Sequence, residues 1–152
     1  MLAFSYVLTG SGWAEVVLEG PNGTARMVAS YLHDSLRQLA EATADLVCGA
    51  TSASVTFMDE PGEHQLMLSR QGSQLLYEVR WYRDWASWDM YPKDRFDVRL
   101  SGSCAVAAFS ASVLDNLQTL LATHGLEGYE QRWVEHPFPS QALTRLTELC
   151  AA

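Results

Sequence analysis

Residues 59–64 concentrate side chains that could bind a metal or transfer a proton. They include three carboxylates and the imidazole of His64, and such donors suit a divalent cation or an acid–base pair. The Pro61-Gly62 pair between Glu60 and Glu63 predicts an exposed hairpin turn. A usable site must be concave, and the spacing matches no zinc motif. The pattern therefore favours a solvated acidic turn, and we predict no metal ligands and no cofactor.

Two other groupings have the residue types of a hydrolase. His33, Asp34 and Ser35 are consecutive, but consecutive residues of a helix point about 100° apart and cannot align as a triad. Cys104 lies near the start of a predicted helix, where the pKa of a thiol falls. Its neighbours are small and apolar, which favours a packed cysteine. We therefore predict no catalytic residue.

The most informative stretch is aromatic, because residues 75–96 hold three of the five tryptophans. Up to residue 82, apolar and polar side chains alternate, which predicts a strand with one face in the core. From 83 to 93 the alternation is lost while aromatic residues continue. Aromatic side chains beside charged ones are typical of protein-binding surfaces. The predicted partner-binding residues are Trp85, Trp88, Tyr91, Asp84, Asp89 and Asp94.

The hydrophobic pattern also predicts the scaffold that positions these residues. Alternation and turn residues predict three strands within 4–29 and four within 52–100. Three- and four-residue spacing predicts a helix over 31–48 with Ser30 as N-cap, a helix ended by Gly125, and a helix from Ser140. The connections are too short for parallel crossovers. We expect one α+β domain over residues 1–152, with an antiparallel sheet of about six to seven strands (βββαββββαα) and helices packed on one face.

Composition limits the partner and the compartment. Eighteen acidic against 10 basic residues give a net charge of −8, which repels nucleic acid and anionic membranes and attracts a basic protein. Three cysteines without CxxC spacing, two of them expected within core elements, indicate reduced thiols. Neither a signal peptide nor a membrane-spanning run is recognisable. We therefore expect a cytoplasmic protein whose partner is another protein, and a basic one.

Three segments carry a resemblance: FSYVLTGSGWAEV, SYLHDSLRQLA and FMDEPGEHQLML. They resemble small bacterial proteins of unknown function, of the sort found among immunity proteins of toxin systems. The likeness covers residues 4–82 and lies in strand, helix and turn positions, so it transfers no catalytic residue. It implies a non-enzymatic protein that binds and neutralises a basic toxin domain.

Two alternative hypotheses remain open. One is a small enzyme or ligand-binding domain with a pocket between sheet and helices, lined by His64 and Glu60 or by Cys104. The other is a homodimer formed through an edge strand.

Overall fold

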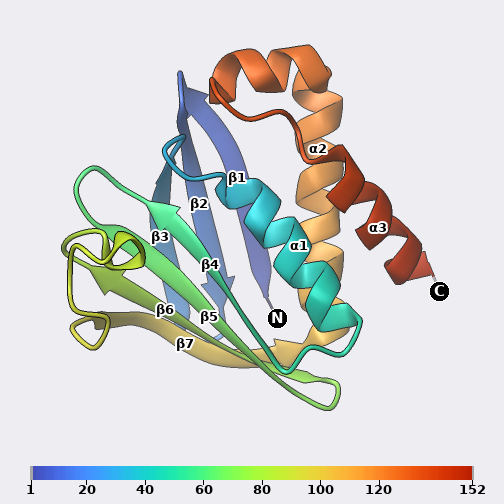
Figure 1. The fold of residues 1–152 in the computed structure, drawn as a ribbon. Coiled ribbons are helices and arrows are strands. Elements are labelled where there is room, and N and C mark those ends of the chain that lie inside the picture. Colours follow the sequence, from blue (N-terminus) through green and yellow to red (C-terminus); the bar gives the residue numbers. More distant parts are fainter. Residues whose placement is uncertain (1, 152) are drawn as a thin grey trace.

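Residues 2–151 are described by a computed structural model, which has seven β-strands, three α-helices and a 3-10 turn (Figure 1). The elements are β1 (Ala3–Gly10), β2 (Trp13–Gly20), β3 (Gly23–Ser30), α1 (Ser35–Val47), β4 (Ser52–Met58), β5 (Glu63–Gln71), β6 (Gln74–Tyr82), η1 (Ala86–Trp88), β7 (Asp97–Ala105), α2 (Val106–Trp133) and α3 (Ser140–Ala151). All strand pairs are antiparallel and join neighbours in the chain. The predicted α+β class and element order are therefore confirmed.

The predicted single sheet is wrong, because the strands form two sheets, β1-β2-β3 and β4-β5-β6-β7. The division falls where α1 separates β3 from β4, which touch without sharing a hydrogen-bonded ladder. Figure 1 shows the second sheet crossing the first at a steep angle. Alternation and turn residues specify hairpins, which are local pairs. They contain no information on whether two strands on either side of a helix will also pair.

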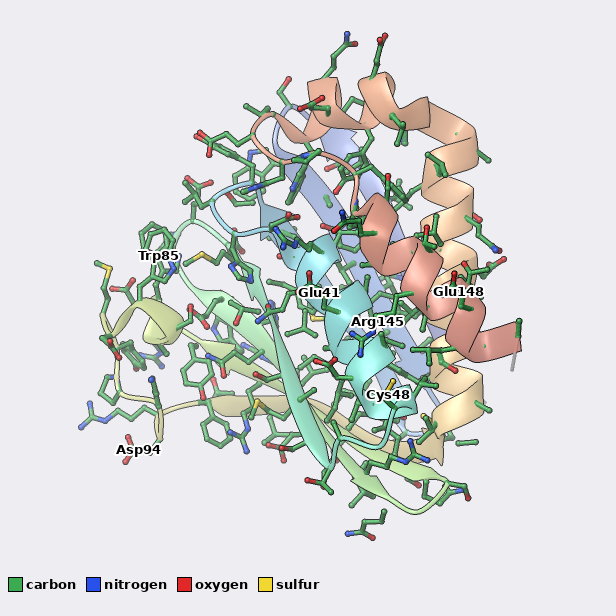
Figure 2. The ribbon with its side chains drawn as sticks, turned by 45° about the vertical axis from the view of Figure 1, so that its right-hand side comes forward. Glu41, Cys48, Trp85, Asp94, Arg145 and Glu148 are labelled. Carbon is green, nitrogen blue, oxygen red and sulfur yellow. The ribbon has the colours of Figure 1, made fainter. Side chains whose placement is uncertain are left out.

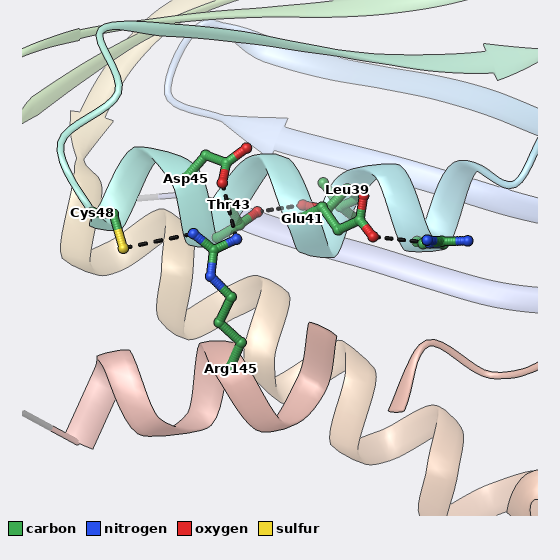
Figure 3. Close-up of polar contacts among 7 residues, drawn as sticks. Leu39, Glu41, Thr43, Asp45, Cys48 and Arg145 are labelled. Carbon is green, nitrogen blue, oxygen red and sulfur yellow. Dashed lines mark hydrogen bonds and ion pairs between the residues drawn. The ribbon is translucent and has the colours of Figure 1, made fainter. Parts of the chain in front are cut away.

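The helices are layered rather than all packed on one sheet face. α1 packs on β4, α2 runs along β1, and α3 packs on α1 and α2 (Figure 1). One tie between α3 and α1 is the Arg145 guanidinium, whose Nη1 lies 2.9 Å from Asp45 Oδ1 (Figure 3). Cys48 Sγ lies 3.7 Å from Nη2 of the same arginine. Cys48 and Cys150 are exposed, whereas Cys104 is half-buried and packs against the core. The expectation of two cysteines within core elements therefore holds for Cys104 and is wrong for Cys48.

Helix α2 also covers the free edge of β1. Ser112 Oγ accepts a hydrogen bond from the Phe4 amide at 3.1 Å, and Asn116 Oδ1 accepts one from the Tyr6 amide at 3.0 Å. The Asn116 amide in turn donates to the Phe4 carbonyl. These side chains form hydrogen bonds with the backbone N–H and C=O groups of β1 that a second chain would need for strand pairing. A homodimer through β1 is therefore disfavoured.

Two predicted helix boundaries have different outcomes. Gly125 has φ 68° and interrupts α2 as predicted, although the helix resumes and continues to Trp133. Helix α1 begins at Ser35 rather than at residue 31, with Asp34 instead of Ser30 as N-cap. The ring of Tyr31 instead lies against Gly12, where an added Cβ would be 2.6 Å from it. Tyr31 packs against Gly12 outside the helix, and α1 begins four residues later, at Ser35.

Candidate functional site

The connection between β6 and β7, residues 83–96, is named the aromatic loop. The side chain of Glu63 anchors it to the sheet by hydrogen bonds. Glu63 is the first residue of β5 and is fully buried. Its Oε1 accepts hydrogen bonds from the Ser87 amide at 3.1 Å and the Ser87 hydroxyl at 2.8 Å, and its Oε2 accepts one from Gln65 at 2.7 Å. A buried carboxylate satisfied in this way forms strong, directional bonds. The turn η1 is therefore fixed to the sheet.

Three further hydrogen bonds fix the remainder of the loop. The indole nitrogen of Trp85 donates to the Asp59 carbonyl at 2.8 Å, and its backbone amide donates to Asp84 Oδ1 at 2.8 Å. The Tyr82 hydroxyl donates to the Lys93 carbonyl at 2.8 Å. Hydrogen bonds therefore fix the backbone of the loop, although most of its length is neither strand nor helix.

This fixed backbone displays large apolar side chains to solvent. Trp88 is 46% exposed and Met90 is 57% exposed. Of the other predicted binding residues, Asp89 and Asp94 are exposed, while Asp84, Trp85 and Tyr91 are half-buried. Figure 2 shows Trp85 and Asp94 at the end of the molecule remote from the helical face that carries Glu41 and Arg145. The aromatic loop is therefore a separate surface.

The side chains of the acidic turn 59–64 contact different elements of the fold and do not converge on a common metal or acid–base site. Glu60 Oε2 accepts a hydrogen bond from Ser30 Oγ at 2.5 Å, whereas Glu63 points beneath the aromatic loop. The His64 ring packs against the Trp81 ring, with centroids 4.7 Å apart and planes tilted by 47°. Burial, assisted by the charge of Arg99, lowers the pKa of His64 to about 4. The expected solvated turn is wrong for Glu63, and no metal-holding group of three His, Cys, Asp or Glu residues occurs within residues 2–151.

Two reactive groups considered for the alternative enzyme hypothesis, His64 and Cys104, also lie apart. His64 pairs with Trp81 and Cys104 with Leu75, so six residues of β6, roughly 20 Å, separate them. Burial raises the pKa of the Cys104 thiol, which disfavours the reactive thiolate. The Ser35 hydroxyl donates to the Thr56 carbonyl at 2.8 Å and is not activated by a histidine there. Two large hollows, of about 820 and 700 Å³, are lined by other side chains.

A second polar group, which the sequence did not reveal, lies where β1, the start of α1 and the end of α2 meet. We name it the buried polar cluster: Tyr6, Asp34, Tyr129, Trp133 and His136. The Nδ1 of His136 lies 3.8 Å from Asp34 Oδ2, and its Nε2 lies 2.9 Å from the Tyr31 carbonyl. Because a carbonyl only accepts, that Nε2 is the donor. One ring nitrogen of His136 is therefore bound to the backbone, while the other faces Asp34 beyond hydrogen-bonding distance.

The buried polar cluster leaves several hydrogen-bonding atoms unpaired. The hydroxyls of Tyr6 and Tyr129, the indole nitrogen of Trp133 and Asp34 Oδ1 are buried without a well-formed hydrogen bond among the residues described, although the Trp133 indole lies near enough to Asp34 to oppose the rise in the pKa of its carboxyl. Burial raises the pKa of Asp34, and the charge of His136 opposes that rise. Burial and the nearby Asp34 charge likewise raise the pKa of Tyr129. No spacing pattern could have found this group, because its members come from distant parts of the chain.

Comparison with known proteins identifies no relative. No family model, no curated protein and no solved structure matches the chain. No helix within residues 2–151 is both long and apolar enough to cross a membrane.

Proposed function

We propose that this chain is a non-enzymatic protein-binding domain whose contact surface is the aromatic loop. The observation that carries the proposal is the exposure of Trp88 and Met90 on a backbone fixed by the buried carboxylate of Glu63. Exposed tryptophan is strongly enriched at the energetic centres of protein interfaces. A loop that is already ordered loses little conformational entropy when it binds. The enzyme alternative has weaker support, since Glu60 is bonded to Ser30 while His64 packs against Trp81, and burial raises the pKa of the Cys104 thiol.

The charge distribution bears on the kind of partner. Residues 83–96 carry three basic and three acidic side chains, so the entire net charge of −8 lies outside the aromatic loop. A long-range field of this sign attracts a basic protein and speeds the encounter. We therefore retain a basic partner, such as a toxin domain in the cytoplasm, as the partner that the net charge supports. The aromatic loop itself contributes apolar contact rather than acidic attraction.

Alanine substitution tests the proposal with a matched control. The double variant Trp88→Ala/Met90→Ala removes the exposed apolar surface of the loop. Leu126→Ala removes an equally exposed apolar side chain, 57% exposed, from α2. Protein immobilised from each variant is exposed to native lysate, and bound protein is quantified by mass spectrometry. We expect the loop variant to lose at least about tenfold of a specific partner, as truncation of a hot spot does, and the Leu126 variant to retain it.

The contrary result is equally clear. Equal recovery of every bound protein by the loop variant, the control variant and the original chain would remove the aromatic loop from partner binding. Circular dichroism of each variant verifies that a loss of binding does not reflect a loss of folding.

A further inference from the structure

The basic side chains divide into two groups by their partners. Six of the ten form an ion pair or donate to a backbone carbonyl within residues 2–151: Arg26, Arg37, Arg70, Arg80, Lys93 and Arg145. Four exposed guanidinium groups have neither kind of partner in the same part of the chain: Arg83, Arg95, Arg99 and Arg132. Three of these four lie within or beside the aromatic loop. This concentration is unexpected in a chain with an excess of carboxylates.

Two of the unpaired arginines share a cavity. Arg83 and Arg95, from opposite ends of the aromatic loop, line a hollow of about 250 Å³ together with Trp81, Tyr91 and Phe96. The guanidinium of Arg99 lies 6.0 Å from the centre of the Trp81 ring. The fixed fork of donors on an exposed guanidinium matches the two oxygens of a carboxylate.

We propose that this cavity, at the base of the aromatic loop, binds a carboxylate from an acidic segment of the partner protein. The inference rests on the proposed function, because it assigns the partner chemistry of the same surface. Asp97 also lines the cavity and has no basic partner at ion-pair distance among the residues described. Two positive charges against one suit a singly charged carboxylate better than a dianionic phosphate.

The net charge of the chain and the local charge of the cavity act over different distances. At a distance, a net charge of −8 repels an isolated acidic peptide, so binding has to come from direct contact with Arg83 and Arg95. A partner that is basic overall can bring one acidic segment to the cavity, because the long-range field then favours the encounter. The carboxylate would provide orientation, while Trp88 and Met90 provide apolar contact area.

The test uses a capped hexaglutamate peptide as probe, with hexalysine and inorganic phosphate as comparisons. Binding is followed through the side-chain Nε–H signals of the arginines and the indole signals of the tryptophans in ¹⁵N NMR spectra. We expect hexaglutamate to give saturable shifts at Arg83 and Arg95. Arg83→Gln/Arg95→Gln should weaken binding at least about tenfold, as loss of charge-assisted hydrogen bonds does. Arg132→Gln, which changes an unpaired arginine on α2, should leave the affinity unchanged.

Several results would overturn the inference. They are equal binding of hexaglutamate by the double arginine variant, shifts at Arg132 as large as those in the cavity, or phosphate binding as tight as peptide binding. The amount of partner recovered from lysate by each variant distinguishes failure of this inference from failure of the proposed function. Loss of the partner with Trp88→Ala/Met90→Ala but full recovery with Arg83→Gln/Arg95→Gln overturns only the carboxylate site. Full recovery with both variants overturns the function of the loop, and the peptide titration still decides whether the cavity binds carboxylates.

Discussion

The aromatic loop and the buried polar cluster contain similar residue types, but they differ in which side chains are hydrogen-bonded and which are exposed to solvent. In the aromatic loop, Ser87 is bonded to the buried carboxylate of Glu63 on β5 and the Trp85 indole is hydrogen-bonded, while Trp88 and Met90 face solvent. In the buried polar cluster, the aromatic rings of Tyr129 and Trp133 are fully buried, and their polar atoms have no well-formed hydrogen bond within residues 2–151. Apolar surface that is exposed to solvent is available for binding a partner. Buried polar atoms without a hydrogen bond lower the stability of the fold.

This contrast shows that residue type alone does not identify a functional surface. An aspartate beside a histidine, as in Asp34 and His136, has the composition of a catalytic pair. The pair is half-buried and lines a hollow of about 290 Å³, and His136 is bound to the Tyr31 carbonyl, so its residue types alone do not establish a catalytic role. In the aromatic loop, the Trp88 ring packs edge-on against Trp85, with ring centroids 5.1 Å apart, yet nearly half of its side chain still faces solvent.

The largest expected effect comes from removing the carboxylate that fixes the aromatic loop. Glu63→Ala leaves the Ser87 amide, the Ser87 hydroxyl and the Gln65 amide without their acceptor. Truncating one partner of a buried charged network costs about 3 kcal/mol of the free energy of unfolding. Urea denaturation measures this change. Glu41→Ala, which removes an exposed ion-pair partner of Arg37 (Figure 3), should cost less than about 0.5 kcal/mol.

If the two glutamate variants were equally stable, Glu63 would not anchor the loop. The contrast between a fixed loop and an unsatisfied cluster would then fail.

Two titratable groups, His64 beside Glu63 on β5 and Asp34 in the buried polar cluster, should respond to acid with opposite signs. The pKa of His64 in the folded chain is about 4, below its ordinary value of about 6.5, so the unfolded chain binds the proton first. Stability is therefore lost as the pH falls from about 6.5 to 4, by about 3 kcal/mol if the full shift applies. The pKa of Asp34 is raised, so its contribution favours the folded chain at low pH. That contribution is lost as the pH rises from the unfolded value of about 3.9 through the folded pKa.

Urea titrations at several pH values separate the two groups. His64→Gln should flatten the loss of stability between pH 6.5 and 4, and Asp34→Asn should gain stability relative to the original chain as the pH rises above 4. The same pH profile in all three proteins would show that neither environment is perturbed as described.

The smallest expected effect concerns strain next to the buried polar cluster. Val134 follows Trp133 and has φ 88° and ψ −62°, a conformation that a β-branched residue rarely adopts. Val134→Gly should relieve this strain and raise the free energy of unfolding by about 1 kcal/mol. Val7→Gly, at a similarly exposed valine within β1, should lower it instead, because glycine weakens a strand. Destabilisation by both changes would mean that Val134 is not strained.

Much of the fold follows from local patterns. Period-2 alternation predicts every strand, and Gly125 interrupts α2 where the sequence places a stop. These features depend on residues close together in the chain. The division into two sheets and the start of α1 at Ser35 depend on contacts across the fold, so local patterns could not specify them.

The candidate site was predictable only in outline. The loss of alternation after residue 82 indicates a loop, and its aromatic composition indicates a surface. Burial of Glu63 beneath Ser87 is not recognisable, since a glutamate beside Pro61-Gly62 has the pattern of an exposed turn. The cavity between Arg83 and Arg95 likewise requires the two ends of the loop to meet, which composition does not show.

Site-specific photo-crosslinking tests the central claim most directly. Benzoylphenylalanine replaces Trp88 in the aromatic loop or Leu126 on α2, two exposed positions on different elements, and each protein is irradiated in native lysate. The account predicts a discrete covalent adduct from position 88, absent from position 126 and diminished by Arg83→Gln/Arg95→Gln. The same adducts from both positions, or none from position 88, would contradict the assignment of the aromatic loop as the binding surface.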